Sequence, residues 1–263
     1  MVEEWTCLTS SELSDLIEKD PLAVLLVGST EQHGLHLPLG TDSIIGGSVF
    51  EKSLDYLPAR TCLVKLPDLT IGVSPEHSGF PGTISYPSGL TVPMVVEIGK
   101  QIERSGMKRL LIINSHGGNS SALDLAGMNL RAEGDLLVAK VDYFRFSKPK
   151  EVVVPQKEWM YGFHGGAVET SMMMHLRPDL VKAEHFDDNN SKLEEMEKDL
   201  RMVGRDRAVT LYWMAHDLHK SGAVGNASIS SEEMGKHLLD HYGRCLSEVI
   251  LDMIEIDLDR IRK

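Results

Sequence analysis

The chain has little of what several specialised protein classes require. Its three cysteines (Cys7, Cys62 and Cys245) are an odd number without a C-x-x-C spacing, which favours neither a disulfide framework nor a thiolate zinc site. No cluster of Lys or Arg stands out, and the net charge is −12. The chain therefore lacks an obvious surface for neutralising phosphates, and we expect no nucleic-acid partner.

Long apolar stretches are also absent. The longest uninterrupted apolar run, residues 22–27, is far shorter than the roughly 20 residues that span a bilayer, so we expect no membrane partner. The first residues are acidic, with Glu3 and Glu4, and no basic region followed by an apolar stretch marks a secretory signal. We therefore expect a cytoplasmic protein.

What is present is typical of a soluble globular protein. Hydrophobic residues make up 42% of the 263 residues and charged residues 25%. No repeat, low-complexity tract or shift in composition marks a linker. The sequence therefore predicts a single domain over residues 1–263.

Apolar runs and helical patterns alternate through the first half of the chain. The runs are typical of strands buried on both faces of a sheet, and they cover residues 22–27, 61–66, 109–113 and 135–141. Helical patterns lie between them, at about 43–57, 91–105 and 120–133. Thr9 with Glu12, and Ser230 with Glu233, predict capping boxes that open a first and a last helix. This order predicts an α/β fold, with a mostly parallel central sheet flanked by helices on both faces.

A group of acidic and imidazole side chains follows the first predicted strand. Glu31 and His33 are two positions apart, so in an extended chain they point to the same side. They also lie where ligands bind in open α/β sheets, beyond the carboxyl end of a strand. Asp42 follows just before a predicted helix, where it either joins these two residues or simply caps the helix.

Two further motifs carry the same kinds of side chain. His116 lies in Asn-Ser-His-Gly-Gly-Asn directly after strand 109–113, and His164 and Glu169 lie at the start of a predicted helix. Each motif alone fits a turn, a cap or a hydrogen-bonded core histidine. Together the motifs provide oxygen and nitrogen ligands without a thiolate, a set suited to zinc, manganese or iron(II).

The three motifs, in this order, resemble the creatininase (creatinine amidohydrolase) family. The strings E-Q-H-G-x-H-L-P-x-x-T-D, N-S-H-G-G-N and H-G-G-x-x-E-T-S carry the resemblance, within residues 22–171. The resemblance implies a single α/β domain that hydrolyses a carbon–nitrogen bond, usually in a homo-oligomer, a hexamer in this family. It also implies a small-molecule amide substrate and two divalent metal ions, zinc first, with manganese or iron as alternatives.

The resemblance also implies roles for individual residues. Carried over motif by motif, Glu31 and His116 hold one metal, His33 holds the other, and Asp42 bridges both. We expect His36, in the same motif as His33, to orient a ligand rather than to bind metal.

The segment after His116 departs from creatininase. Creatininase has a Tyr and a Glu where this chain has Gly117 and Gly118, so one coordination position is open, and Glu169 is our candidate to fill it. Met160 stands where creatininase carries a tryptophan. Creatinine is therefore a poor substrate candidate, and the Gly-Gly form looks more like the archaeal formamide deformylases and the mycofactocin-maturation peptidases.

The expected mechanism is hydrolysis by a metal-activated water. Two cations sharing a water would lower its pKa from about 16 toward 7. We expect His164 to protonate the leaving nitrogen, and the backbone N–H groups of Gly165 and Gly166 to hold the oxyanion. Five residues are expected on the substrate side: Ser74, His77, Gly117, Gly118 and Gly165. For His77, a hydrogen bond that only stabilises its loop is the competing interpretation.

Two other functions compete with this hypothesis. A nucleotide-binding module would need G-x-G-x-x-G or a P-loop after a strand, and neither motif occurs. A catalytically silent metal-binding or regulatory protein would keep the same ligands without turnover.

Overall fold

The central sheet is parallel, as the apolar runs predict. A computed structural model describes residues 2–205 and 207–260, and its main sheet has five strands in the order β1-β3-β2-β4-β5. The strands are β1 (Val2–Glu4), β2 (Leu22–Val27), β3 (Leu63–Lys65), β4 (Arg109–Asn114) and β5 (Leu137–Asp142). Every neighbouring pair in this sheet is parallel.

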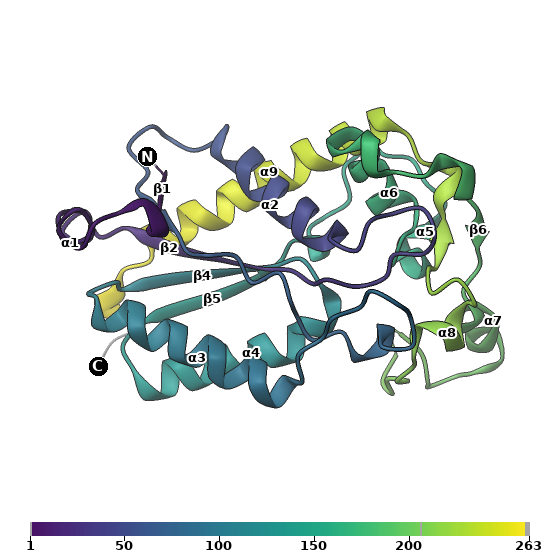
Figure 1. Ribbon diagram of the computed structural model, residues 1–263, viewed down its shortest axis with the longest axis horizontal. Helices are drawn as coiled ribbons and strands as arrows, with labels where there is room; N and C mark the ends of the chain where they lie inside the picture. The colour runs from purple at the N-terminus through teal and green to yellow at the C-terminus, as the bar shows by residue number, and fades with distance from the viewer. Residues whose placement is uncertain (1, 206, 261–263) are drawn as a thin grey trace.

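Helices cover both faces of this sheet (Figure 1). One face packs against α2 (Thr41–Leu54), α6 (Ala167–Leu176) and α9 (Glu232–Glu255). The other face packs against α1 (Ser10–Ile17), α3 (Ser88–Arg104) and α4 (Ser120–Glu133). Side chains of β2 alternate between the two cores, with Val24 in the first and Leu25 in the second. The predicted α/β architecture is therefore confirmed.

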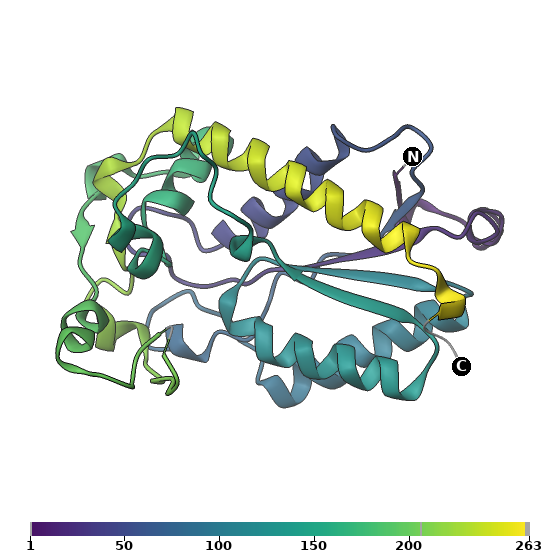
Figure 2. The same cartoon turned by 180° about the vertical axis from the view of Figure 1, so that it is seen from behind.

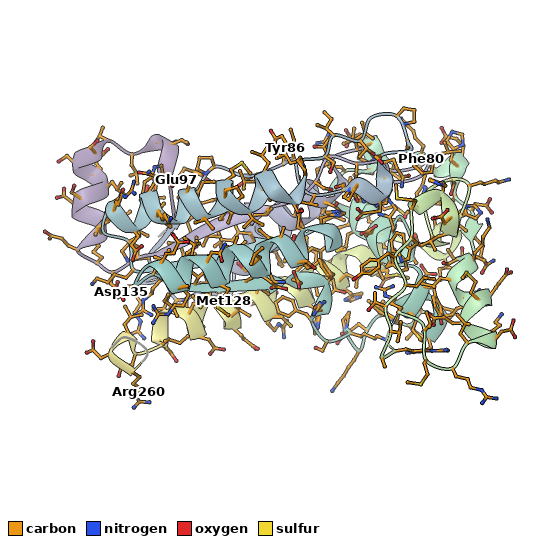
Figure 3. All side chains as sticks on the ribbon, turned by 90° about the horizontal axis from the view of Figure 1, so that it is seen from below. Phe80, Tyr86, Glu97, Met128, Asp135 and Arg260 are labelled. Carbon is orange, nitrogen blue, oxygen red and sulfur yellow. The ribbon has the colours of Figure 1, made fainter. Side chains whose placement is uncertain are left out.

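The view onto the second face shows how α3 and α4 cover it. These two helices run side by side in Figure 3, with Glu97 on α3 and Met128 on α4. Met128 is 68% exposed, so this helix layer has solvent on its outer side. Among residues 2–205 and 207–260, no helix combines the length and the apolar character that crossing a membrane takes.

The helix ends follow the capping signals with one correction. Thr9 and Glu12 form the predicted capping box at the start of α1. The prediction for the last helix was wrong by one position, because Ser231, not Ser230, caps α9 and accepts the Met234 N–H. The Ser230 hydroxyl instead donates to the Ala167 carbonyl, which ties this turn to the start of α6.

Residues 143–205 and 207–231 gather at the end of the sheet where the strands finish, and α9 then runs back along one face (Figures 1 and 2). The short elements there are α5 (Gln156–Tyr161), β6 (Asp188–Asn189), α7 (Lys192–Asp199), α8 (Ala215–Leu218) and β7 (Gly225–Asn226). In α6, Met172 and Met173 are fully buried in the core, so these methionines fill the interior rather than form a surface. Residues 143–205 and 207–231 therefore cover the carboxyl edge of the sheet, where the predicted site lies.

Candidate metal centre

The fold brings the three sequence motifs together. Glu31 and His33 follow β2, Asp42 lies in the first turn of α2, His116 follows β4, and Glu169 lies in the first turn of α6. Glu31 and His33 are completely buried, and Asp42 and His116 are nearly so. Such a concentration of buried titratable side chains requires partners to offset the cost of removing them from water.

Asp42 lies at the centre of this group. Its Oδ1 is 3.3 Å from His33 Nε2, and its Oδ2 is 3.3 Å from His116 Nδ1. The Ser29 hydroxyl donates to the same Oδ2. The N-cap of α2 is Gly40, so Asp42 does not cap the helix and the interpretation as a member of the cluster holds. One carboxylate thus faces both imidazoles.

Glu31 and His116 form one side of the cluster. Glu31 Oε1 is 3.2 Å from His116 Nδ1, yet neither Glu31 oxygen has a hydrogen-bond partner among the described residues. On the opposite edge of the ring, His116 Nε2 is 3.1 Å from the Val73 carbonyl and 3.2 Å from Ser74 Oγ. A proton on Nε2 satisfies the Val73 carbonyl, so Nδ1, which faces the carboxylates, is the ring nitrogen that could exchange its proton for a cation.

His33 and Glu169 form the other side. His33 Nδ1 donates to the Glu31 carbonyl at 3.1 Å, and Nε2 lies 3.9 Å from Glu169 Oε2 without a hydrogen-bond partner in the described part of the chain. The Gly165 N–H donates to Glu169 Oε2 at 2.6 Å, from a backbone with φ of 66° that suits glycine. This N–H was expected to face the oxyanion, but in the structure it is engaged by Glu169.

The electrostatics show how strongly these groups interact. Burial alone would lower the pKa of His33, but Asp42 and then Glu169 and Glu31 raise it to about 9. The pKa of His116 also lies well above its ordinary value despite burial, because of Glu31 and Asp42. Burial raises the pKa of Glu169 to about 7, against the opposing effect of His33. Without a cation, protons on the histidines therefore balance the carboxylates.

These side chains fit divalent cations. Within each of three overlapping groups, one possible ligand atom per residue lies within 4.8 Å of the others. The groups are Glu31 with Asp42 and His116, His33 with His164 and Glu169, and Glu31 with His77 and His164. Buried carboxylate oxygens and an imidazole nitrogen without hydrogen-bond partners among the described residues are the ligand atoms expected of a metal centre with mixed oxygen and nitrogen ligands.

The two remaining predicted histidines lie against the same cluster. His77 Nε2 is 3.5 Å and His164 Nδ1 is 3.6 Å from Glu31 Oε1, and their rings are stacked with centroids 4.1 Å apart. Burial, reinforced by His33 and His77, holds the pKa of His164 well below its ordinary value. His164 is therefore neutral in this structure. His36 Nε2 faces the Gly165 carbonyl and Thr170 Oγ1, away from the carboxylates.

The space beside Gly118 is taken up by Glu76, a residue that the sequence analysis did not single out. A Cβ at Gly118 would come within 2.7 Å of Glu76 Oε1 and 2.3 Å of the Val73 carbonyl. Glu76 Oε1 lies 3.5 Å from His116 Nε2, whereas Glu169 lies on the His33 side of the cluster. The only sequence signal for Glu76 is its place beside His77, in the Gly- and Pro-rich segment 72–83. Gly117, by contrast, faces open space.

Asn119 explains why the loops meet so closely. Its side-chain oxygen accepts the Val73 N–H at 2.8 Å, and its amide nitrogen donates to the Gly28 carbonyl at 2.9 Å. Asn114 Oδ1 accepts the His116 N–H at 3.1 Å. Asn119 thus fixes the loops after β2, β3 and β4 relative to one another, and Asn114 holds the backbone of His116 in place.

The chain is similar in sequence and fold to proteins of one family. Residues 6–250 match the family model described as Creatininase, creatinine amidohydrolase. The chain is 34% identical over 199 residues to the mycofactocin precursor peptide peptidase of Mycolicibacterium smegmatis, over 74% of this chain and 73% of that protein. It is 33% identical over 187 residues to the creatinine amidohydrolase of Pseudomonas putida, over 65% and 70%. A solved structure of a creatininase mutant, described as Zn-Zn type, matches with a TM-score of 0.74 at 26% identity, over 96% of this chain and 98% of that one.

Proposed function

The chain belongs to the creatininase family of amidohydrolases, and from this membership we propose that it cleaves a carbon–nitrogen bond of a small amide with the help of two divalent metal ions. The observation that carries the proposal is the set of buried atoms around Asp42 without hydrogen-bond partners among the described residues, the Glu31 oxygens and His33 Nε2. A buried carboxylate is stable only when it is paired or coordinates a metal. Neither the family match nor the relatives favour the alternative of a catalytically silent protein.

The positions of the side chains support one assignment of ligands. Glu31 and His116 would hold the first ion, and His33 and Glu169 the second, with Asp42 between them. Glu169 would then bind the same ion as His33, and would not fill the coordination position next to Gly118. Zinc is the first candidate, because these ligands suit it and a similar structure is described as Zn-Zn type, with manganese or iron as alternatives.

The reaction is a hydrolysis in which His164 moves one proton. When bound, the two ions would supply a water of lowered pKa and would polarise the substrate carbonyl. His164 Nδ1 takes a proton from the water as its oxygen bonds to the carbonyl carbon. The carbon–nitrogen bond then breaks, its electron pair stays on the nitrogen, and His164 returns the proton to that nitrogen. This refines the earlier expectation, because a neutral His164 must accept a proton before it can donate one.

The substrate is proposed at the level of its reacting group. Two relatives are named for compounds of very different size, a precursor peptide and creatinine, so size does not narrow the choice. A formamide, a lactam, a cyclic urea and a short peptide all contain a carbon–nitrogen bond of the kind to be cleaved. The likeness of the Gly117-Gly118 form to the formamide deformylases and the mycofactocin-maturation peptidases favours the formamide and the peptide. Screening these four classes against zinc-loaded protein tests the proposal. Turnover of none of them, with both ions bound, would contradict it.

Two further proposals concern the whole protein. We propose a cytoplasmic location, and a homo-oligomer that is hexameric by resemblance to the family. Exposed Leu35, Leu39 and Ile84 lie on segments joined by backbone hydrogen bonds beside the cluster and are the apolar surface that a second copy could cover. Light scattering measures the assembly, and a monomer of 29.2 kDa at micromolar concentration would contradict it.

A further inference from the structure

The Gln32 side chain is held in one orientation by the backbone. Its Oε1 accepts the Gly34 N–H at 2.9 Å, and its Nε2 donates to the Gly222 carbonyl at 2.9 Å. Exchanging the oxygen and nitrogen would set a donor against a donor and an acceptor against an acceptor. Gln32 is buried, and Gly222, with φ of 78°, leaves no room for a Cβ beside the amide. The amide orientation is therefore fixed.

This orientation determines the tautomer of His77. An amide nitrogen carries two protons, and one of them goes to Gly222. The second points at His77 Nδ1, 2.7 Å away, which must then be the unprotonated nitrogen of the ring. A neutral His77 carries its proton on Nε2, the atom that lies 3.5 Å from Glu31 Oε1. His77 thus presents a donor to the metal centre.

The backbone of the same residue determines the tautomer of His164. His164 Nε2 lies 2.7 Å from the Gln32 carbonyl oxygen, which can only accept, so this nitrogen is protonated. The nearby Gln32 Nε2, at 3.0 Å, is itself a donor and does not compete for that proton. The unprotonated Nδ1 then faces Glu31 Oε1. His164 thus presents an acceptor to the metal centre.

We propose that Gln32 is a positioning residue that holds two stacked histidines in opposite tautomers, so that His77 offers a proton donor and His164 a proton acceptor on one side of the metal centre. The side chain of Gln32 acts on His77, and its backbone carbonyl acts on His164. The competing interpretation of His77, as a residue that only stabilises its loop, does not account for a donor aimed at a buried carboxylate.

In the hydrolysis, the two tautomers have separate tasks. This part of the inference rests on the proposed function. The Nε2–H of His77 stabilises the negative charge that develops on the carbonyl oxygen of the substrate, and His164 Nδ1 receives the proton of the attacking water. A donor fixed in this way contributes about 10²- to 10³-fold in kcat, because it needs no reorientation during the reaction.

The test reads the tautomers directly, by solid-state ¹⁵N NMR of zinc-loaded protein labelled at its 11 histidines. His77→Gln and His164→Gln variants assign the two sets of signals. The native protein is expected to show His77 protonated at Nε2 and unprotonated at Nδ1. In Gln32→Glu, the carboxylate accepts a proton from His77 Nδ1, so the tautomer of His77 reverses while that of His164 is unchanged. Native protein with His77 protonated at Nδ1 would overturn the inference.

Two controls keep the result interpretable. Gln32→Met has no donor and no charge, and it is expected to give a mixture of His77 tautomers if Gln32→Glu does not fold. Gln101→Glu makes the same chemical change on the exposed surface of α3 and is expected to leave both signals unchanged. With a substrate in hand, Gln32→Glu is expected to lower kcat about 10²-fold with little effect on KM. Absence of any substrate would refute the proposed function, whereas the NMR result decides the role of Gln32 either way.

Discussion

Glu169 and His164 lie five positions apart on one segment, yet they face the cluster with different chemistry. Glu169→Gln replaces the carboxylate that we propose as a ligand by a neutral amide, so the ion proposed beside His33 is expected to be lost and the metal content to fall from two ions to about one. His164→Ala is expected to keep both ions and to lose about 10²- to 10⁴-fold in turnover. Elemental analysis and a turnover assay separate the two variants.

Each variant has an outcome that contradicts the assignment. Full metal content in the Glu169→Gln protein would mean that Glu169 only orients a neighbour, such as the Gly165 N–H that it accepts. Metal loss in the His164→Ala protein would place His164 Nδ1 among the ligands, where two of the three groups also put this residue.

Gly118 and Gly117 provide a matched pair of substitutions. A Cβ at Gly118 meets the Val73 carbonyl and Glu76, whereas a Cβ at Gly117 meets nothing within 4 Å. Gly118→Ala is therefore expected to cost about 1–3 kcal/mol in the free energy of unfolding and to weaken metal binding at His116. Gly117→Ala is expected to be close to neutral. Urea denaturation of both variants checks this, and equal losses would refute the role given to the space beside Gly118.

At the residue scale, the sequence predicts the members of the buried cluster better than it predicts the residues that support them. Glu31, His33 and His116 could be found because each follows an apolar strand, and parallel strands end at the same edge of the sheet. Glu76 and Gln32 could not, because their roles depend on contacts between distant loops. Gln32 and His164, for example, are 132 positions apart.

Among the elements, α5 and α6 are held together by one buried side chain. Glu158 Oε1 accepts the Ala167 N–H at 2.7 Å, and Oε2 accepts the Asn226 N–H at 2.9 Å. Glu158→Ala leaves both donors without these acceptors and is expected to cost about 3 kcal/mol in the free energy of unfolding. It is also expected to displace Glu169, which lies in the first turn of α6.

Glu151 is the control for this substitution, since it is exposed and lies shortly before α5. Glu151→Ala is expected to change the free energy of unfolding by less than about 0.5 kcal/mol. A Glu158→Ala protein as stable as Glu151→Ala would show that Glu158 does not hold the start of α6.

The elements themselves were predictable where their pattern is long. The six residues of β2 and the fourteen residues of α4 match their predicted bounds. β1 escaped prediction because three residues are too few for a pattern, and β6 and β7 have two residues each. The predicted strand 61–66 shortens to Leu63–Lys65, because only these residues pair with both neighbouring strands.

For the molecule as a whole, the metal-free protein is expected to lose stability as the pH rises. The pKa of His33 is about 9 in the folded chain and about 6.5 when unfolded. Below pH 6.5 His33 is protonated in both the folded and the unfolded chain, and its contribution to the free energy of unfolding is fully present. This contribution is lost as the pH rises through about 9. The Tm of metal-free protein should therefore fall between about pH 6.5 and 9.

Zinc-loaded protein and His33→Asn provide the comparison. A histidine that binds a metal has already lost its proton, so zinc-loaded protein should not show the fall of Tm with pH that His33 causes. Metal-free His33→Asn should not show it either. Parallel slopes in native and His33→Asn protein, both without metal, would contradict the raised pKa of His33.

The central claim is that Asp42 joins two ions in one centre, and metal content per chain tests it most directly. Protein purified without chelator is expected to carry two divalent ions per chain, measured by elemental analysis. Asp42→Ala should lose both, because the carboxylate faces His33 and His116 alike, whereas Asp15→Ala, at an exposed position, should keep both. A single ion per chain in the native protein, or one ion retained in Asp42→Ala, would contradict the account.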